Sequence, residues 1–255
     1  MDNAYILEIK NLNVHYNPNI HSIKNVSLSV ERGKTTALIG SKDCGKTSLL
    51  RSINRLHELY NNIEVTGEIY FDGNDLMKMN AIEVRKKIGM VFKNPYPFPN
   101  LNIFENVLAA YGINQIKLNK KEKEIKVNKY LTDVGLWDEV KDLLYERPGI
   151  LTESQQQQLC IARAIAIEPE VLLMDESGFP LDPAATSKIE NLMYQLKNKC
   201  TLIFATQNLS LAARISDFII YMEQNEVIEC GVTSELFWNP MDKRTENYIN
   251  TQSYY

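Results

Sequence analysis

Hydrophobic and polar residues alternate along the first part of the chain, as they do in strands with one buried face. The alternation covers residues 6–16 and 26–30. It returns at 67–71, where the turn Asp72-Gly73-Asn74 follows directly. A turn of this kind after an alternating segment is a hairpin signal. We therefore predict an antiparallel β region in the N-terminal part of the chain.

The pattern changes in the middle of the chain. A proline cluster at 94–100 leads into helical periodicity at 103–110 and 118–144, where Lys and Glu are frequent. This change predicts a mostly helical subdomain inserted into the fold. The run 119–126 has Ile125 as its only apolar residue, which is typical of a solvated helix face.

Short apolar runs of the kind that form buried strands dominate the rest of the chain. They predict strands at 171–174 and 201–206, a helix at 209–215, and a hairpin of 217–223 with 226–230 around Gln224-Asn225. The predicted fold class is therefore α/β. One domain spans 1–255, with 1–93 and about 165–255 as β region and core, and about 94–164 as the helical subdomain.

A glycine-bearing segment lies between the buried run Thr35–Ile39 and an apolar helix pattern. It reads GSKDCGKTS and fits the motif G-x-x-x-x-G-K-[ST] in the strand, loop and helix setting that the motif requires. Backbone N–H groups of such a P-loop, together with the helix N-terminus, bind phosphate. The predicted nucleotide-binding residues are Gly40, Ser41, Lys42, Asp43, Cys44, Gly45, Lys46, Thr47 and Ser48.

A triphosphate and Mg²⁺ are the ligands that this motif predicts. Lys46 would reach the β- and γ-phosphates, and the Thr47 hydroxyl would take one Mg²⁺ position. Asp43 is unusual so close to the phosphates, because its charge repels the ligand. Aspartate nevertheless tolerates left-handed backbone better than most residues, so the loop can still form.

Two carboxylates follow the predicted buried strand at 171–174. Ligands bind at the carboxyl ends of strands in open α/β sheets. We predict that Asp175 holds the water shell of Mg²⁺ and that Glu176 is the general base for the attacking water. Tyr16, at the end of the first strand, either stacks on the nucleotide base or is an ordinary edge-strand tyrosine.

Composition narrows the class of protein. Of the 255 residues, 44% are hydrophobic, which is enough to form a large core. The net charge of −4 argues against a general nucleic-acid-binding surface. Cysteines at 44, 160, 200 and 230 lack metal-ligand spacing, and no signal peptide is evident, so we expect reduced thiols in a cytoplasmic protein. No apolar stretch approaches the ~20 residues of a membrane span. Membrane association would therefore need a partner.

The order of motifs resembles that of ABC-transporter nucleotide-binding subunits over essentially the whole chain. The motifs are the P-loop, the segment 91–99, Leu151-Thr152-Glu153-Ser154-Gln155, Asp175-Glu176, Leu181-Asp182 and Thr206-Gln207. Within that superfamily, segments 155–164, 168–176 and 212–217 look most like the ATPase subunit of the bacterial phosphate importer, the PstB family.

The resemblance implies a P-loop ATPase core of the ABC type that works as a head-to-tail-facing dimer. Each ATP would lie between the P-loop of one subunit and Thr152, Ser154 and Gln155 of a second ATP-binding subunit, either a copy or a paralogue. Dimer closure would drive a transmembrane permease, which the proline cluster would face. The protein would be peripheral at the cytoplasmic face of the membrane, and phosphate would arrive through a separate binding protein.

Several positions depart from the family pattern, among them residues 177–180, which differ from the usual Pro-Thr-Ser-Ala before Leu181-Asp182. Glu153 and Ser154 replace two glycines of the signature, and these side chains obstruct the approach to the γ-phosphate. Gln207 stands where the family has its switch histidine. Its amide can donate a hydrogen bond to the γ-phosphate but carries no charge. Lys93 replaces a glutamine and can neutralise phosphate or pair with a carboxylate. Glu176, Gln207 and Lys93 are the predicted catalytic residues.

Two hypotheses follow from the motifs and their departures. The first is an ATPase motor of a phosphate importer that is slowed by its substitutions. The second is a degenerate subunit that binds ATP without useful turnover and serves a competent paralogue. Another transported substrate and a soluble ABC protein remain further alternatives.

Overall fold

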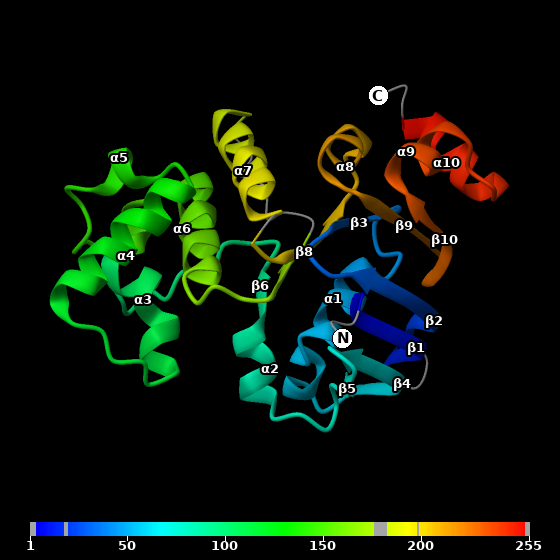
Figure 1. Cartoon of the computed structure of the whole chain (residues 1–255), viewed down its shortest axis with the longest axis horizontal. Coiled ribbons are helices and arrows are strands. Elements are labelled where there is room, and N and C mark those ends of the chain that lie inside the picture. Colours follow the sequence, from blue (N-terminus) through cyan, green and yellow to red (C-terminus); the bar gives the residue numbers. More distant parts are fainter. Residues whose placement is uncertain (1–3, 18–19, 176–182, 198, 253–255) are drawn as a thin grey trace.

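The computed structural model describes residues 4–17, 20–175, 183–197 and 199–252 and contains two β-sheets (Figure 1). A four-stranded antiparallel sheet has the order β2-β1-β4-β5. Its strands are β1 (Tyr5–Tyr16), β2 (His21–Glu31), β4 (Ile63–Phe71) and β5 (Asn74–Asp75). The predicted N-terminal antiparallel β region is therefore confirmed.

The second sheet has six strands in the order β10-β9-β3-β8-β7-β6. The strands are β3 (Thr35–Ile39), β6 (Ile88–Val91), β7 (Val171–Met174), β8 (Thr201–Thr206), β9 (Phe218–Glu223) and β10 (Glu226–Val232). All neighbouring pairs are parallel except the β9–β10 hairpin. The carboxyl ends of β3, β6, β7 and β8 therefore meet at one edge, where the P-loop also begins.

Both faces of the six-stranded sheet are buried. Leu172 and Met174 of β7 pack into one hydrophobic core, and Val171 and Leu173 pack into the other. The first core is closed by α6 (Glu153–Ile165), α7 (Pro183–Leu196), α8 (Leu209–Ile215), α9 (Thr233–Trp238) and α10 (Lys243–Gln252). The second is closed by the antiparallel sheet, α1 (Lys46–Ile53) and α2 (Ala81–Lys87). Continuous apolar strands are what a parallel sheet covered on both faces requires.

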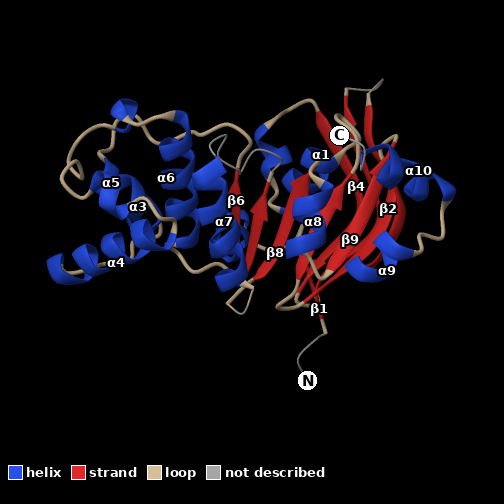
Figure 2. Ribbon diagram, turned by 90° about the horizontal axis from the view of Figure 1, so that it is seen from above, coloured by secondary structure: helices blue, strands red, loops and turns tan. Residues whose placement is uncertain are grey.

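Helices α3 to α6 gather at one end of the molecule, beside β6 (Figure 2). They are α3 (Ile103–Ile113), α4 (Lys120–Asp133), α5 (Trp137–Val140) and α6. Short 3₁₀ turns lie after α1, at η1 (Leu56–Leu59), and before α6, at η2 (Pro148–Ile150). Asn102 and Asn119 cap α3 and α4 through capping boxes. Residues 119–125 are exposed, which confirms the predicted solvated face.

The proline-rich segment beside these helices is held by one buried side chain. Asn106 of α3 accepts a hydrogen bond from the backbone N–H of Phe98 at 2.7 Å and donates to the backbone oxygens of Phe98 and Leu101, both at 3.1 Å. Asn106 is fully buried. Because prolines lack an N–H, this amide supplies hydrogen bonds that the segment cannot make with itself.

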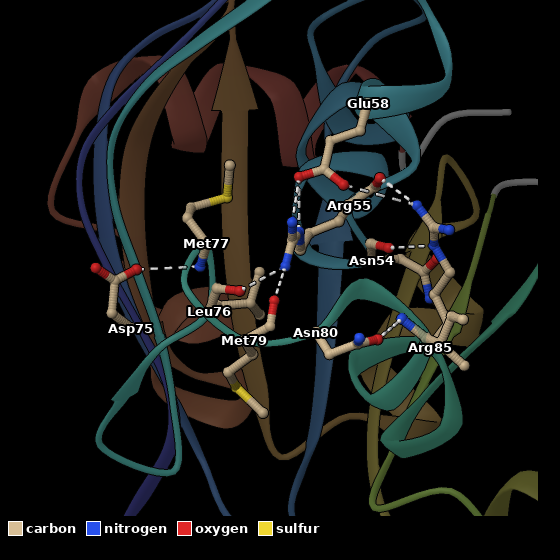
Figure 3. Close-up of polar contacts among 10 residues, drawn as sticks. Asn54, Arg55, Glu58, Asp75, Leu76, Met77, Met79, Asn80 and Arg85 are labelled. Atoms are coloured by element: carbon tan, nitrogen blue, oxygen red, sulfur yellow. Dashed lines mark hydrogen bonds and ion pairs between the residues drawn. The ribbon is translucent and has the colours of Figure 1, made fainter.

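A buried arginine anchors the end of α1 (Figure 3). Arg55, one residue beyond the cap of that helix, donates to the backbone oxygens of Leu76 (3.1 Å) and Met79 and pairs with Glu58. Arg85 of α2 donates to the backbone oxygen of Arg55 at 2.8 Å. The helix that carries the P-loop is thereby fixed at its far end.

The structure also differs from the sequence prediction at β4, which begins at Ile63 rather than at Gly67. Gly67 has a φ of 99° opposite an irregularity of β1, and a Cβ there would lie 2.5 Å from the Asn11 oxygen. It therefore lies inside a bulged strand, where glycine permits close backbone approach, instead of marking its start.

Candidate nucleotide-binding site

The loop after β3 has the backbone of an anion-binding P-loop. Gly40 has a φ of 146° and Gly45, directly before α1, a φ of 100°. A Cβ would lie 2.2 Å from the backbone oxygen of Met222 at Gly40, and 2.6 Å from that of Ser22 at Gly45. Asp43 takes the left-handed φ of 62° that the sequence reasoning allowed for aspartate. Both glycines are thus required by conformation and by space.

Lys46 is folded into this loop and is only 4% exposed. Its Nζ donates to the backbone oxygens of Gly40 at 2.8 Å and Ser41 at 2.7 Å, and lies 3.6 Å from the Sγ of Cys44. The carbonyls thus hold an ammonium at the centre of the loop. A phosphate there would meet both this charge and the backbone N–H groups at the start of α1.

Thr47 joins the P-loop to the end of β7. Its hydroxyl donates to both carboxylate oxygens of Asp175, at 2.9 and 3.1 Å, and Asp175 is 3% exposed. The backbone N–H of Asp175 donates to the oxygen of Val91 at 2.9 Å. Two motifs that lie 128 residues apart are therefore brought into direct contact.

A cavity of about 400 Å³ opens over the P-loop. Of the predicted residues, it is lined by Tyr16, Lys42, Asp43, Gly45, Lys46, Thr47, Ser48 and Lys93. The Tyr16 hydroxyl lies 3.5 Å from the Ser48 Oγ, which also contacts the Ser22 Oγ. Tyr16 thus lies at the wall of the cavity, and its stacking on a nucleotide base stays a prediction.

Sequence reasoning missed five further lining residues: Ile20, His21, Ser22, Arg51 and Asn225. Arg51 follows Thr47 by four residues on α1, so helical periodicity could have found it. The Asn225 side chain donates to the His21 backbone oxygen at 2.8 Å, across 204 residues of sequence. Only the folded chain brings those two turns together.

Charge in the cavity favours an anion. Among the described lining residues, the four cationic side chains of Lys42, Lys46, Arg51 and Lys93 outnumber the one carboxylate, that of Asp43. A neighbouring histidine adds little to this charge. Desolvation lowers the pKa of His21 below its ordinary value, and His15 and Lys24 lower it further. The lowered pKa favours the neutral form of His21.

The signature residues lie elsewhere, at the start of α6. Thr152 and Gln155 form a capping box, and the Gln155 Nε2 donates to Glu139 at 2.9 Å. The Ser154 Oγ is buried. In the described part of the chain, Thr152, Ser154 and Gln155 do not line the P-loop cavity. Their contact with a nucleotide held by a second subunit stays a prediction.

Neither Gln207 nor Glu176, two of the predicted catalytic residues, is among the described residues that line the cavity. Gln207 follows β8 and is exposed, but within the described ranges it is not among the residues that line the cavity. Glu176 and the segment Leu181-Asp182 lie outside the described residues. Where the structure describes the chain, no group of three or more His, Cys, Asp or Glu residues is placed to hold a metal. A metal here would depend on hydroxyl and ligand oxygens as well.

Residues 23–178 match the family described as ABC transporter. The chain belongs to the ABC transporter family. It is 43% identical over 236 residues to the "Phosphate import ATP-binding protein PstB" of Pyrobaculum aerophilum, covering 92% of this chain and 94% of the relative. It is 42% identical to the protein of the same name from Tropheryma whipplei, covering 96% and 97%.

Solved structures agree with this assignment to the ABC transporter family. cbiO1 from Clostridium perfringens, part of the ABC transporter complex cbiONQ, superposes with a TM-score of 0.76 at 26% identity over 93% of this chain and 92% of that one. The ATP-binding cassette MJ0796, in a dimeric post-hydrolysis state with ADP and Pi, gives 0.78 at 26% over 89% and 98%. The predicted fold class, an α/β P-loop fold of the ABC ATPase type, is confirmed. Among the helices of the described ranges, none has the length and apolar character needed to cross a bilayer.

Proposed function

We propose that this ABC protein binds and hydrolyses ATP to power an importer of inorganic phosphate. The observation that carries the proposal is the contact of Thr47 with Asp175, below a cavity into which Lys46 brings positive charge. The transported ion is inferred from the two PstB relatives, whose names state phosphate import. ATP is the proposed nucleotide because the relatives are ATP-binding proteins.

The residues of the loop would bind and orient the triphosphate. Lys46 would exchange its bonds with the Gly40 and Ser41 oxygens for bonds to phosphate oxygens, which are stronger because both partners are charged. Tyr16 would stack on the base. Glu176 would take the proton of the attacking water, and Gln207 would donate a hydrogen bond to the terminal phosphate.

The same residues fit Mg²⁺. The Thr47 hydroxyl and the Asp175 carboxylate present adjacent oxygens, the ligand type that Mg²⁺ prefers, and Asp175 is almost fully buried. Thr47 would bind the ion directly, and Asp175 would hold its water shell. When bound, Mg²⁺ would neutralise charge on the phosphates.

A second ATP-binding subunit would complete the site. Thr152, Ser154 and Gln155 begin a helix whose N-terminus favours anions, and the dimeric MJ0796 structure supports pairing as a property of this fold. Glu153 is exposed at the first position of that helix, so it would weaken dimer closure on ATP. The partner is a copy of this chain or a paralogue.

A groove of about 1150 Å³ is the proposed docking surface for the transmembrane permease. Its apolar lining includes Phe98, Phe104, Ile113 and Tyr145, from the proline-rich segment, α3 and the loop before η2. Permeases are hydrophobic partners, and contiguous exposed apolar side chains mark interaction sites. Docking there would place the protein at the cytoplasmic face of the membrane. Phosphate would reach the permease from a separate binding protein.

Ile113→Asp is expected to abolish assembly with the permease. Ile113 is 68% exposed in the groove, so a carboxylate there leaves the fold intact but is desolvated in the complex. Co-purification with the permease should fall about tenfold or more, while ATP affinity is unchanged. The control Ile125→Asp, on the exposed face of α4, should co-purify normally. Equal losses in both variants would contradict docking in the groove.

Steady-state ATP hydrolysis tests the proposed function. The purified protein should hydrolyse ATP, and Glu176→Gln should lower turnover about 1,000-fold because the general base is lost while ATP binding is retained. Turnover that does not change in the variant would show that the activity has another source. Nucleotide binding without turnover, even with the permease and a paralogue added, would contradict the motor and favour the degenerate subunit.

A further inference from the structure

Lys93 lines the nucleotide cavity from the end of β6, not from the P-loop. It lies two residues beyond Val91, the last residue of β6, and Val91 pairs with Met174 of β7. The oxygen of Val91 accepts the backbone N–H of Asp175. Lys93 therefore leaves the sheet beside the carboxylate that holds the Thr47 hydroxyl.

Ammonium groups thus line the cavity from two separate supports, with Lys42 and Lys46 on the P-loop and Lys93 beyond the end of β6. Lys46 is buried in the loop and is bonded to its carbonyls, whereas Lys93 is exposed at the strand edge and lines the same cavity. Lysine has a flexible stem and a compact charge, so it can follow a phosphate without a fixed geometry. Thr47 lines the cavity too, and it is linked to the end of β6 through Asp175, which accepts its hydroxyl and donates its backbone N–H to Val91.

We propose that Lys93 binds the terminal phosphate of the nucleotide, so that the site distinguishes a triphosphate from a diphosphate by charge and retains triphosphate without Mg²⁺. This inference rests on the proposed function, because it needs a nucleotide in this cavity. A triphosphate carries one more negative charge than a diphosphate, and that charge lies on the group which only the triphosphate has. A cation at that end therefore strengthens the binding of one ligand and hardly affects the other.

Calorimetric titration with ADP and with AMP-PNP, a triphosphate that is not hydrolysed, tests this role. Both ligands are titrated in EDTA and again in Mg²⁺. Lys93→Gln should weaken AMP-PNP binding in EDTA about tenfold, the loss of one hydrogen bond to a charged group, and change ADP binding less than about twofold. Lys93→Arg should restore the preference, because it keeps the charge. Lys42→Gln, the control at the loop rim, should weaken both ligands by the same factor.

Different results would contradict the role of Lys93 and the proposed function. Equal effects of Lys93→Gln on both ligands, or no effect on either, would overturn the role of Lys93 while leaving ATP binding intact. Wild-type protein that binds neither nucleotide, with or without Mg²⁺, would overturn the proposed function and this inference together.

Discussion

Lys46→Met is expected to lower the affinity for ATP about 100-fold, or ~3 kcal/mol. Methionine nearly keeps the length of the side chain but removes the ammonium that sits at the centre of the loop. Two hydrogen bonds to charged phosphate oxygens are lost, because the Lys46 ammonium that now bonds the Gly40 and Ser41 oxygens is gone. Isothermal titration calorimetry with ATP measures the change.

Lys42→Met is the matched control for that loss. Lys42 is exposed on the same loop, so water and salt screen its attraction for the phosphates. The loss of its charge should therefore weaken ATP binding only about threefold. Circular dichroism melting would check that both variants remain folded. ATP affinity of Lys46→Met within a factor of three of wild type would mean that the buried lysine serves the loop structure rather than the ligand.

Gly40→Ala is the second large expected effect, a loss of about 3 kcal/mol or more of unfolding free energy. The new Cβ would lie 2.2 Å from the Met222 backbone oxygen and 2.7 Å from the Cys44 Sγ, at a φ of 146° that alanine rarely adopts. Neither β9, which carries Met222, nor the P-loop can move without breaking sheet contacts. Urea denaturation followed by circular dichroism measures the loss.

Two other glycines separate the causes. Gly33 has a φ of 69° with nothing within 4 Å of a Cβ, so Gly33→Ala should lose about 1 kcal/mol from backbone strain alone. Gly112 lies in α3 with open space around it, so Gly112→Ala should stabilise by about 0.5 kcal/mol or more. If Gly40→Ala lost no more than Gly33→Ala, the close approach to Met222 would be without energetic effect.

Local signals were enough to predict the P-loop and the strands around it. Thr35–Ile39, the loop and the following helix form one continuous segment, so the motif contains its own structural context. The contact between Thr47 and Asp175 could be predicted only through the rule that ligands bind at the carboxyl ends of parallel strands. The order of the strands in the sheet then brings Thr47 and Asp175 close together.

Contacts between turns could not be predicted in this way. Asn225 reaches the cavity because the β9–β10 hairpin packs beside the start of β2, and no residue near either turn encodes that pairing. The start of β4 was missed for a different reason. Gly67 was interpreted as punctuation, whereas the fold uses it within a bulge that approaches Asn11.

The buried Asn106 makes the proline-rich segment a rigid connection between helices. The Arg163 Nη2 on α6 donates to the Tyr96 oxygen at 2.9 Å, and its guanidinium lies 4.4 Å from the centre of the Phe98 ring. With Asn106 on α3, the segment is tied to two helices at once. A movement of Phe98 would therefore displace both helices, because these contacts leave the segment little freedom to move by itself.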